Sequence, residues 1–194
     1  MSSLRIGFAF CGSFCTYTKA INALEQIKSD FGDVTPIVSE HGAELDTRFG
    51  NAHDFLMEME RICNRRVIAT IQAAEPIGPK KLLDALIIAP CTGNTLAKLA
   101  LGVTDTSVTM AAKAHLRNGR PLVIAVSTND GLAASARNIG DLLCRKNVYF
   151  VPFRQDDPCG KPTSLVADFD LISDTLRNAL QGRQIQPVLL APLT

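Results

Sequence analysis

Three largely apolar segments limit what this chain can fold into: 4–11 (LRIGFAFC), 85–90 (ALIIAP) and 120–128 (RPLVIAVST). A strand that is exposed to water on one face has polar residues at alternate positions, whereas a strand that helices cover on both faces is apolar throughout. None of the three segments shows the alternating pattern. They are therefore typical of central strands in a parallel sheet that is buried between two layers of helices.

Segments with helical periodicity separate these strands. Residues 16–29 and 51–64 have apolar residues at helical spacing, and Thr16 and Asn51 are their candidate N-caps. The proline-bearing segment 67–81 predicts a short strand and a loop. Further helices are expected at 96–101, 105–117, 130–144 and 165–180, and further strands at 34–40 and 147–153. The alternation predicts an α/β fold with a doubly wound parallel sheet, in a flavodoxin-like, Rossmann-type three-layer sandwich.

The chain has the length and charge of an ordinary globular protein. Its 194 residues are expected to form one α/β domain over 1–182, followed by a C-terminal tail over 183–194 that either packs on a neighbouring subunit or is a loose terminus. A formal net charge of +1 gives no general attraction for nucleic acid or for an anionic membrane. No run of about 18 apolar residues occurs, so no membrane-spanning helix is expected.

Six cysteines and three histidines are scattered along the chain without the spacing of a zinc site, so no metal site is expected. The apolar start runs directly into Gly12 and Ser13, and we interpret it as a buried first strand and not as an export signal. A cytoplasmic location with reduced thiols follows from this interpretation.

Small polar residues follow the predicted strands, at the edge of the sheet where ligands bind in doubly wound folds. After the first strand, Gly12 permits a tight turn and Ser13 can donate its hydroxyl to a phosphate group. The amides at the start of the next helix favour the same anion. An ordinary turn between a strand and a helix also uses Gly and Ser, so this pair alone does not identify a phosphate site.

A second polar group opens the helix after the strand at 85–90. It consists of Thr92, Asn94 and Thr95, with Gly93 among them. Helix capping explains one of the three polar residues. Three together favour a polar or anionic ligand.

Two further positions complete the candidate site. Ser127 and Thr128 end the third apolar segment, ahead of Asn129 and Asp130, which can serve simply as helix N-caps. Ser39 ends the predicted strand at 34–40, where a turn residue is the alternative. The residues predicted to surround a bound cofactor are Gly12, Ser13, Ser39, Thr92, Asn94, Thr95, Ser127 and Thr128.

A nicotinamide dinucleotide is a poorer candidate ligand. No Gly-x-Gly-x-x-Gly fingerprint follows the first strand, because Gly7 and Gly12 do not reproduce its spacing. Glu40 lies where an acid would bind a ribose, yet one acid without the glycines is weak support. The phosphate loop of nucleoside-triphosphate hydrolases is also absent from the sequence.

Residues 89–130 resemble the flavoprotein family that includes the cysteine decarboxylases and the flavin prenyltransferases. Their sequence is APCTGNTLAKLALGVTDTSVTMAAKAHLRNGRPLVIAVSTND. In that family a Pro-x-Ser/Thr-x-Asn/Lys-Thr segment opens a helix beside the flavin, an Asp follows the helix, and a basic residue and a proline precede the next strand. The matching positions here are 90–95, Asp105, Arg120 and Pro121. The resemblance implies a flavodoxin-like fold, FMN as the cofactor and a homo-oligomer, either a trimer or a dodecamer.

Within the family, the chain resembles one component of a two-component oxidoreductase of spore-forming bacteria, from 5–16 through 36–42 to 151–168. The segment QDDPCGKP (155–162) is the most specific part of the likeness. The resemblance implies a cytoplasmic protein of the mother cell, a ring dicarboxylate substrate that loses two hydrogens, and a separate Rossmann-type partner chain.

Arg154 and Lys161 flank the acidic residues of this segment and are predicted to bind the carboxylates of the substrate. Arginine can hold a carboxylate through two parallel hydrogen bonds, so Arg154 is the stronger candidate. Ion pairs with Asp156 and Asp157 explain the two cations equally well. No residue is assigned as the general base.

The chain departs from both named groups of the family at the end of the third apolar segment. The cysteine decarboxylases carry a Pro-x-Met-Asn motif there and the prenyltransferases an Arg-Glu-Thr-Pro motif, and residues 126–130 (VSTND) match neither. These departures argue against decarboxylation and prenyl transfer. Two alternatives to the oxidoreductase hypothesis stay open: a non-catalytic scaffold that activates its partner, and a stand-alone flavin-dependent decarboxylase.

Overall fold

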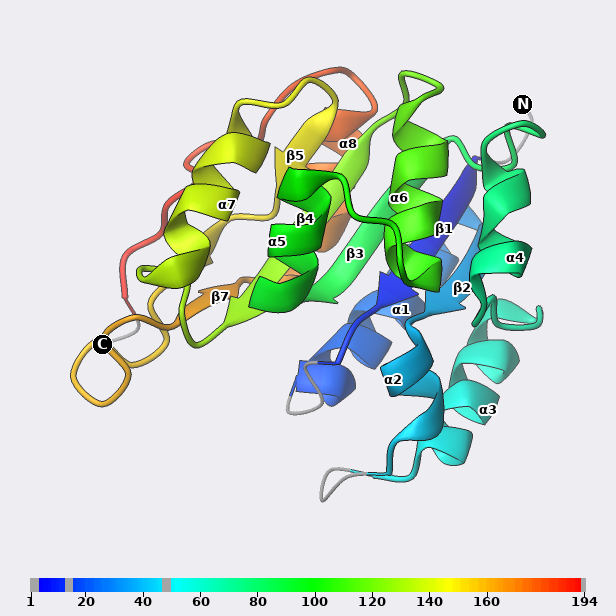
Figure 1. The fold of residues 1–194 in the computed structure, drawn as a ribbon, viewed down its shortest axis with the longest axis horizontal. Helices are drawn as coiled ribbons and strands as arrows, with labels where there is room; N and C mark the ends of the chain where they lie inside the picture. Colours follow the sequence, from blue (N-terminus) through cyan, green and yellow to red (C-terminus); the bar gives the residue numbers. More distant parts are fainter. Residues whose placement is uncertain (1–3, 13–15, 47–49, 193–194) are drawn as a thin grey trace.

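The computed structural model describes residues 4–12, 16–46 and 50–192, which fold around one central sheet (Figure 1). Its parallel strands follow the order β2-β1-β3-β4-β5. They are β1 (Arg5–Phe10), β2 (Asp33–Val38), β3 (Ala85–Cys91), β4 (Leu122–Thr128) and β5 (Val148–Phe150). This is the strand order of flavodoxin-like doubly wound folds. It confirms the fold class that the apolar segments predicted.

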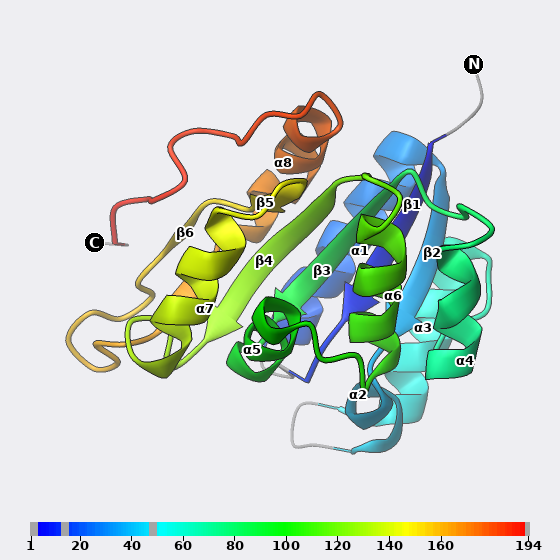
Figure 2. The ribbon, with the colours of Figure 1, turned by 45° about the horizontal axis from the view of Figure 1, so that its top comes forward.

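Helices cover both faces of the sheet (Figures 1 and 2). One layer contains α4 (Ile71–Ala74), α5 (Gly93–Leu101), α6 (Ser107–Leu116) and α7 (Ala134–Leu143). The other layer contains α1 (Tyr17–Phe31), α3 (Ala52–Cys63) and α8 (Ile172–Ala179), and the short α2 (Glu40–Glu44) follows β2. None of the described helices has the length and apolar character needed to cross a membrane.

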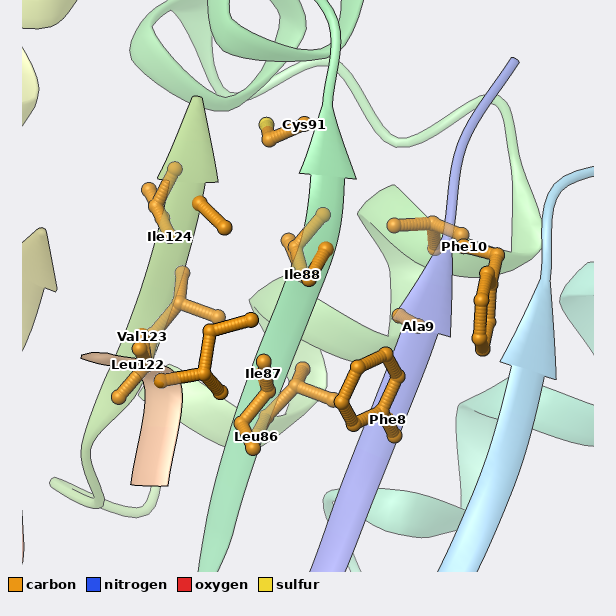
Figure 3. Close-up of a cluster of buried hydrophobic side chains, with 14 of the residues drawn as sticks. Phe8, Ala9, Phe10, Leu86, Ile87, Ile88, Cys91, Leu122, Val123 and Ile124 are labelled. Carbon is orange, nitrogen blue, oxygen red and sulfur yellow. The ribbon is translucent and has the colours of Figure 1, made fainter. Parts of the chain in front are cut away.

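The core is built on the three central strands. Every residue of β3 is buried, and so is every residue of β1 and β4 except Arg5 and Thr128. Figure 3 shows Phe8 of β1, Ile88 of β3 and Ile124 of β4 in this cluster. Burial of each large apolar side chain contributes about 1.5–3 kcal/mol. The core therefore holds the ends of these strands, where the candidate site lies, in fixed relative positions.

The segment predicted as a helix at 165–180 begins as a strand. β6 (Phe153–Arg154) and β7 (Leu165–Ala167) form an antiparallel hairpin, and β7 also pairs with the end of β4. Helix α8 follows only after the 3-10 helix η3 (Phe169–Leu171). Because β5 stops at Phe150 and pairs with the first half of β4, the second half of that edge is available to β7. Such long-range pairing overrides a local helical pattern.

The prediction of a short strand within 67–81 is wrong. The strand is reduced to one parallel bridge, between Ile37 and Ile68. The middle of the segment is helical, in α4 and then in the 3-10 helix η2 (Glu75–Ile77). Pro76 lies in the first turn of η2, where proline is tolerated because no amide donor is required there.

The C-terminal tail runs along β5 and β6 of its own chain. The backbone amide of Phe150 donates to Gln184 Oε1 (2.8 Å), and Gln184 Nε2 donates back to the Phe150 carbonyl (2.7 Å). The amide of Phe153 donates to the Val188 carbonyl, and its carbonyl accepts from the Leu190 amide, both at 3.0 Å. These bonds extend the sheet beyond β6. The division of the chain at residue 182 stays a prediction.

Candidate functional site

The predicted cofactor residues belong to four connections at one edge of the sheet, the carboxyl edge, where β1, β2, β3 and β4 end (Figure 2). Backbone contacts join these connections. The Ser39 amide donates to the Phe10 carbonyl (3.0 Å), and the pairing of β3 with β4 continues to Cys91 and Val126. The described candidates that share this edge are Gly12, Ser39, Thr92, Asn94, Thr95, Ser127 and Thr128, whereas Ser13 lies outside the described residues.

The start of α5 satisfies much of its own hydrogen bonding. Thr92 is the N-cap: its Oγ1 accepts from the Thr95 amide (3.3 Å) and donates to Thr95 Oγ1 (3.2 Å). Capping therefore accounts for Thr92. Asn94 is exposed, and its side chain has no hydrogen-bond partner in the part of the chain that the structure describes. It is the member of this group whose amide is open to a ligand.

Gly93 packs against the connection that follows β4. A Cβ atom at this position would lie 2.6 Å from Asp130 Oδ1, 2.6 Å from Ser135 Oγ and 2.7 Å from Thr128 Oγ1. Such separations leave no room for a side chain, so space requires glycine here. The close packing fixes the start of α5 relative to the end of β4, and these are two of the predicted cofactor-binding segments.

The hydroxyl of Thr128 has a fixed hydrogen-bonding role. It donates to Asp130 Oδ1 (2.5 Å), and this bond, with a second from Ser135, holds the pKa of Asp130 below its usual value. A hydroxyl group has one proton, so toward a ligand Thr128 acts as an acceptor. The side chain of Asp130 orients Thr128 and does not cap α7, which begins only at Ala134. Sequence reasoning missed this role, because it depends on the fold of the connection.

Ser127 and Thr128 point to opposite faces of the sheet, because neighbouring residues of a strand alternate. Thr128 lies against Gly93 and so faces the α5 layer. Ser127 is 8% exposed, pairs with Val166 of β7, and faces the layer of α1 and α8. One ligand can contact both residues only at the very end of the strand.

Ser39 and Glu40 serve the helices that follow them. Ser39 is the N-cap of α2, and its Oγ accepts from the Gly42 amide (3.4 Å). The carboxylate of Glu40 accepts from the Ser107 amide at 3.0 and 3.3 Å, at the start of α6. An acid at this position is favoured by the positive end of the helix dipole. The turn alternative thus accounts for the Ser39 hydroxyl, and Glu40 is committed to α6.

The start of α1 differs from that of α5. Its N-cap residue, Thr16, makes no side-chain cap bond, whereas the first turns of both helices contain no acidic residue. Gly12, just before it, is exposed. The positive end of the dipole of this 15-residue helix lies at this point. Of the two helix starts, this one is better suited to a phosphate.

Neither an activated thiol nor a metal-binding cluster occurs at the described part of this edge. Burial raises the pKa of the Cys11 thiol to about 11 and that of Cys91 well above its usual value. Both thiols therefore stay protonated at neutral pH. Within ranges 4–12, 16–46 and 50–192, no group of three or more His, Cys, Asp and Glu side chains is placed to hold a metal ion.

The predicted substrate residues lie on the β6–β7 hairpin, and both form ion pairs. Lys161 Nζ is 3.4 Å from Asp156 Oδ2 on the exposed loop, as the ion-pair alternative expects. Arg154 pairs with Asp168 instead, with Nη2 at 2.5 Å from Oδ2. The Arg154 side chain is 18% exposed and that of Lys161 58%, so Arg154 is the more enclosed cation. Carboxylate binding by either residue stays a prediction.

Two positions of the family pattern have structural roles. Asp105 lies 2.9 Å from Lys98 of α5 and ties the connection after α5 to that helix. Arg120 precedes β4 and so lies at the opposite edge, where its Nη1 is 3.1 Å from Asp84 Oδ1. Arg120 therefore stabilises the starts of the strands and does not line the carboxyl edge.

A doubly wound sheet with polar groups at its carboxyl edge is characteristic of nucleotide- and flavin-binding α/β proteins. The sequence model of the Flavoprotein family matches residues 1–153, and the chain belongs to that family. This confirms the family resemblance of the 89–130 stretch. Membership supports a flavin as the cofactor.

Two relatives place the chain more closely within the family, and a third protein shares its fold. It is 44% identical to the dipicolinate synthase B subunit of Bacillus subtilis (strain 168) over 193 residues, covering 98% of this chain and 96% of that protein. The crystal structure of the dipicolinate synthase B subunit from Bacillus halodurans C is 40% identical, with a TM-score of 0.90 and coverage of 100% of both chains. The FMN-dependent cysteine decarboxylase SpaF shares the fold at 22% identity, with a TM-score of 0.64 over 91% of this chain and 97% of that one.

Proposed function

We propose that this chain is the FMN-binding B subunit of a dipicolinate synthase. This oxidoreductase makes dipicolinic acid from dihydrodipicolinate, or from its hydrated precursor, by removing two hydrogens. The observation that carries the proposal is the full-length likeness to the dipicolinate synthase B subunit of Bacillus subtilis, at 44% identity over 98% of the chain. The segment QDDPCGKP (155–162) pointed to the same subgroup from the sequence alone.

The described residues fit FMN better than a flavin without a phosphate. The first turn of α1 contains no acid, so a phosphate there would meet the positive end of the helix dipole and no opposing charge from that turn. Asn94 offers an open amide, and Thr128 offers an acceptor for an N–H or O–H group. We propose Gly12, Ser13, Ser39, Thr92, Thr95 and Ser127 as the remaining contacts.

FMN accepts a hydride when it is bound, and aromatisation of the product ring favours the loss of two hydrogens. The contribution of this chain is binding and orientation. Asp130 holds the Thr128 proton, so that Thr128 presents an acceptor. Gly93 keeps the start of α5 against that pair and so preserves the spacing between two walls of the site.

The proposal includes a partner and an assembly. The relatives are B subunits by name, which implies a dipicolinate synthase A subunit as the partner. We propose that this partner is a separate Rossmann-type chain that shares the dicarboxylate substrate. We further propose a homo-oligomer, a trimer or a dodecamer, that works in the cytoplasm of the mother cell during sporulation.

A dipicolinate assay tests the proposal. Ultraviolet absorbance follows product formation from the lysine-pathway precursor, with and without FMN and the A-subunit partner. Product that appears only when this chain, FMN and the partner are all present is the expected result. If the partner formed the product at the same rate without this chain or FMN, the chain would be a non-catalytic scaffold. Carbon dioxide release by this chain and FMN alone would instead establish a stand-alone decarboxylase.

A further inference from the structure

A groove on the α1–α8 face lies beside the candidate flavin contacts and is used by none of them. Its volume is about 780 Å³, and it runs between α1 on one wall and the β6–β7 hairpin, η3 and α8 on the other. Figure 2 shows α1 and α8 on the same side of the sheet. The charged residues that line the groove are three cations, Lys19, Arg154 and Arg177, and four acids, Asp30, Asp168, Asp170 and Asp174.

Arg154 has hydrogen-bonding capacity that the described chain does not use. A guanidinium has five N–H donors, and within the described residues the one partner of Arg154 is Asp168 Oδ2, which lies 2.5 Å from Nη2. The other oxygen of Asp168 accepts from the Asp170 amide (3.3 Å), so the carboxylate that orients the arginine is itself held in place. An oriented, largely enclosed guanidinium with unused donors suits a carboxylate ligand.

The groove contains one more acid than cation, but its cations differ in how they are paired. Toward α8, Arg177 Nη2 lies 2.7 Å from Asp30 Oδ2, and its guanidinium lies over the Phe31 ring, 5.1 Å from the centroid. Lys19 is in the first turn of α1, is exposed, and makes no ion pair or hydrogen bond with the described part of the chain. The unused cationic donors therefore belong to Lys19 and Arg154, on the two walls of the groove.

The Arg154 end of the groove is next to the carboxyl edge. Arg154 pairs with Val166, and Val166 pairs with Ser127 at the end of β4. Residues that are paired across strands point to the same face, so these three side chains form one row on the α1–α8 face. Neighbouring strands are about 4.8 Å apart, which separates the backbones of Arg154 and Ser127 by about 10 Å. A small ligand held by Arg154 can thus extend to the strand end.

We infer that this groove binds one carboxylate of a small ring dicarboxylate, with Arg154 as the anchoring residue and Lys19 as the second cation. The inference rests on the proposed function and deepens it, because it places the substrate ring between the groove and the flavin at Ser127. Asp168 is the positioning residue that orients the guanidinium.

Calorimetric titration of the FMN-loaded full-length chain with pyridine-2,6-dicarboxylate tests this inference. Arg154→Gln should weaken binding by about 10- to 100-fold, the loss typical of a charge-assisted hydrogen bond. Lys19→Gln should weaken it by less, because lysine is a flexible point charge. Lys146→Gln, which replaces an exposed lysine ahead of β5, is the matched control and should leave the affinity unchanged.

Two additional measurements keep the test decisive. Arg154→Lys retains the charge without the planar fork and should give an intermediate affinity. Circular dichroism establishes that each variant is folded, and the exposed Lys19→Gln tests the site even where a variant at Arg154 does not fold.

Equal dicarboxylate affinity in wild type, Arg154→Gln and Lys19→Gln would overturn the inference, as would no binding to wild type at millimolar concentrations. FMN affinity, followed separately by quenching of flavin fluorescence, reports on the proposed function. Wild type that fails to bind FMN contradicts the flavin role. Normal FMN affinity with no effect of either substitution on dicarboxylate binding contradicts the groove site alone.

Discussion

The amino edge and the carboxyl edge of the sheet differ in how their polar groups are satisfied. At the amino edge, Asp84 accepts from Arg5 Nε and Nη2 (3.0 and 2.8 Å) and lies 3.1 Å from Arg120 Nη1. The hydrogen bond from Arg5 holds the pKa of Asp84 below its usual value. At the carboxyl edge, the exposed side chain of Asn94 has no hydrogen-bond partner among the described residues.

This difference separates groups that stabilise the fold from groups that bind. Charges paired with each other have little capacity left for a ligand, whereas open donors and acceptors in a well-bonded protein mark a place where a ligand completes the hydrogen bonding. The two helix starts at the carboxyl edge also differ in their N-caps. Helix α5 is capped by Thr92, whereas α1 makes no such bond from its own N-cap side chain.

The largest expected effect belongs to the amino edge. His115 is 1% exposed, and its Nε2 donates to the Pro121 carbonyl (3.0 Å). Burial lowers the pKa of His115 from 6.5 to about 4, with Arg120 adding to the effect and the Pro121 carbonyl and Asp84 opposing it. Below pH 6.5 the unfolded chain binds a proton that the native state binds only near pH 4. The free energy of unfolding should therefore fall by about 3 kcal/mol across this window.

Urea unfolding between neutral pH and about pH 4 measures this loss. His115→Phe should flatten the slope, because it removes the buried titrating group. His53→Gln replaces an exposed histidine and is the matched control. A wild-type stability that does not change across the window would contradict a neutral, buried histidine and weaken the contrast between the two edges.

A smaller effect is expected where α5 meets the connection after β4. Gly93→Ala places a Cβ 2.6–2.7 Å from three oxygen atoms. We expect a loss of about 1–3 kcal/mol in the free energy of unfolding, as for other overpacked sites. At Gly140, within α7, an added Cβ meets nothing within 4 Å, so Gly140→Ala should stabilise the protein by about 0.5–1 kcal/mol.

Thermal unfolding of the two alanine variants measures this contrast. Compared with wild type, the unfolding temperature should be lower for Gly93→Ala and higher for Gly140→Ala. Equal stabilities would show that the start of α5 can move away from Thr128 and Asp130. The two walls of the site would then lack the fixed spacing that distinguishes this part of the carboxyl edge.

The smallest effect sharpens the comparison of the two helix starts. Thr18 is exposed in the first turn of α1. Thr18→Asp should stabilise the flavin-free protein by about 0.3–1 kcal/mol through the helix dipole. The same charge should weaken FMN binding about tenfold, as expected for two like charges separated by roughly 6 Å in a partly screened site. Fluorescence titration measures the affinity, with Thr18→Asn as the neutral control.

Riboflavin, which lacks the phosphate, distinguishes the cause of this change. Its affinity should be the same for wild type and Thr18→Asp. If FMN and riboflavin were weakened equally, the α1 start would not be the phosphate position, and the contrast between α1 and α5 would lose its functional meaning.

The sequence by itself determined the layered fold and the edge at which the site lies. Apolar runs without alternation correspond to β1, β3 and β4, because strands covered on both faces need apolar residues throughout. Asn51 was also predicted correctly as an N-cap, since its side chain accepts from the His53 amide two residues on (2.8 Å). These signals are local in the sequence. The position of the site then follows from a general rule, because ligands of doubly wound folds bind at the carboxyl ends of the parallel strands.

Only the tertiary structure decided which polar groups are committed and which are open. The carboxylate partner of Arg154 is Asp168, which directly follows the second strand of a hairpin that the helical pattern of 165–180 concealed. Likewise, the role of Thr128 depends on Asp130 and on the close approach of Gly93 from another strand's connection. Hydrogen-bond partners and packing neighbours that lie far apart along the chain meet only after the sheet has formed, and for that reason no local pattern contains them.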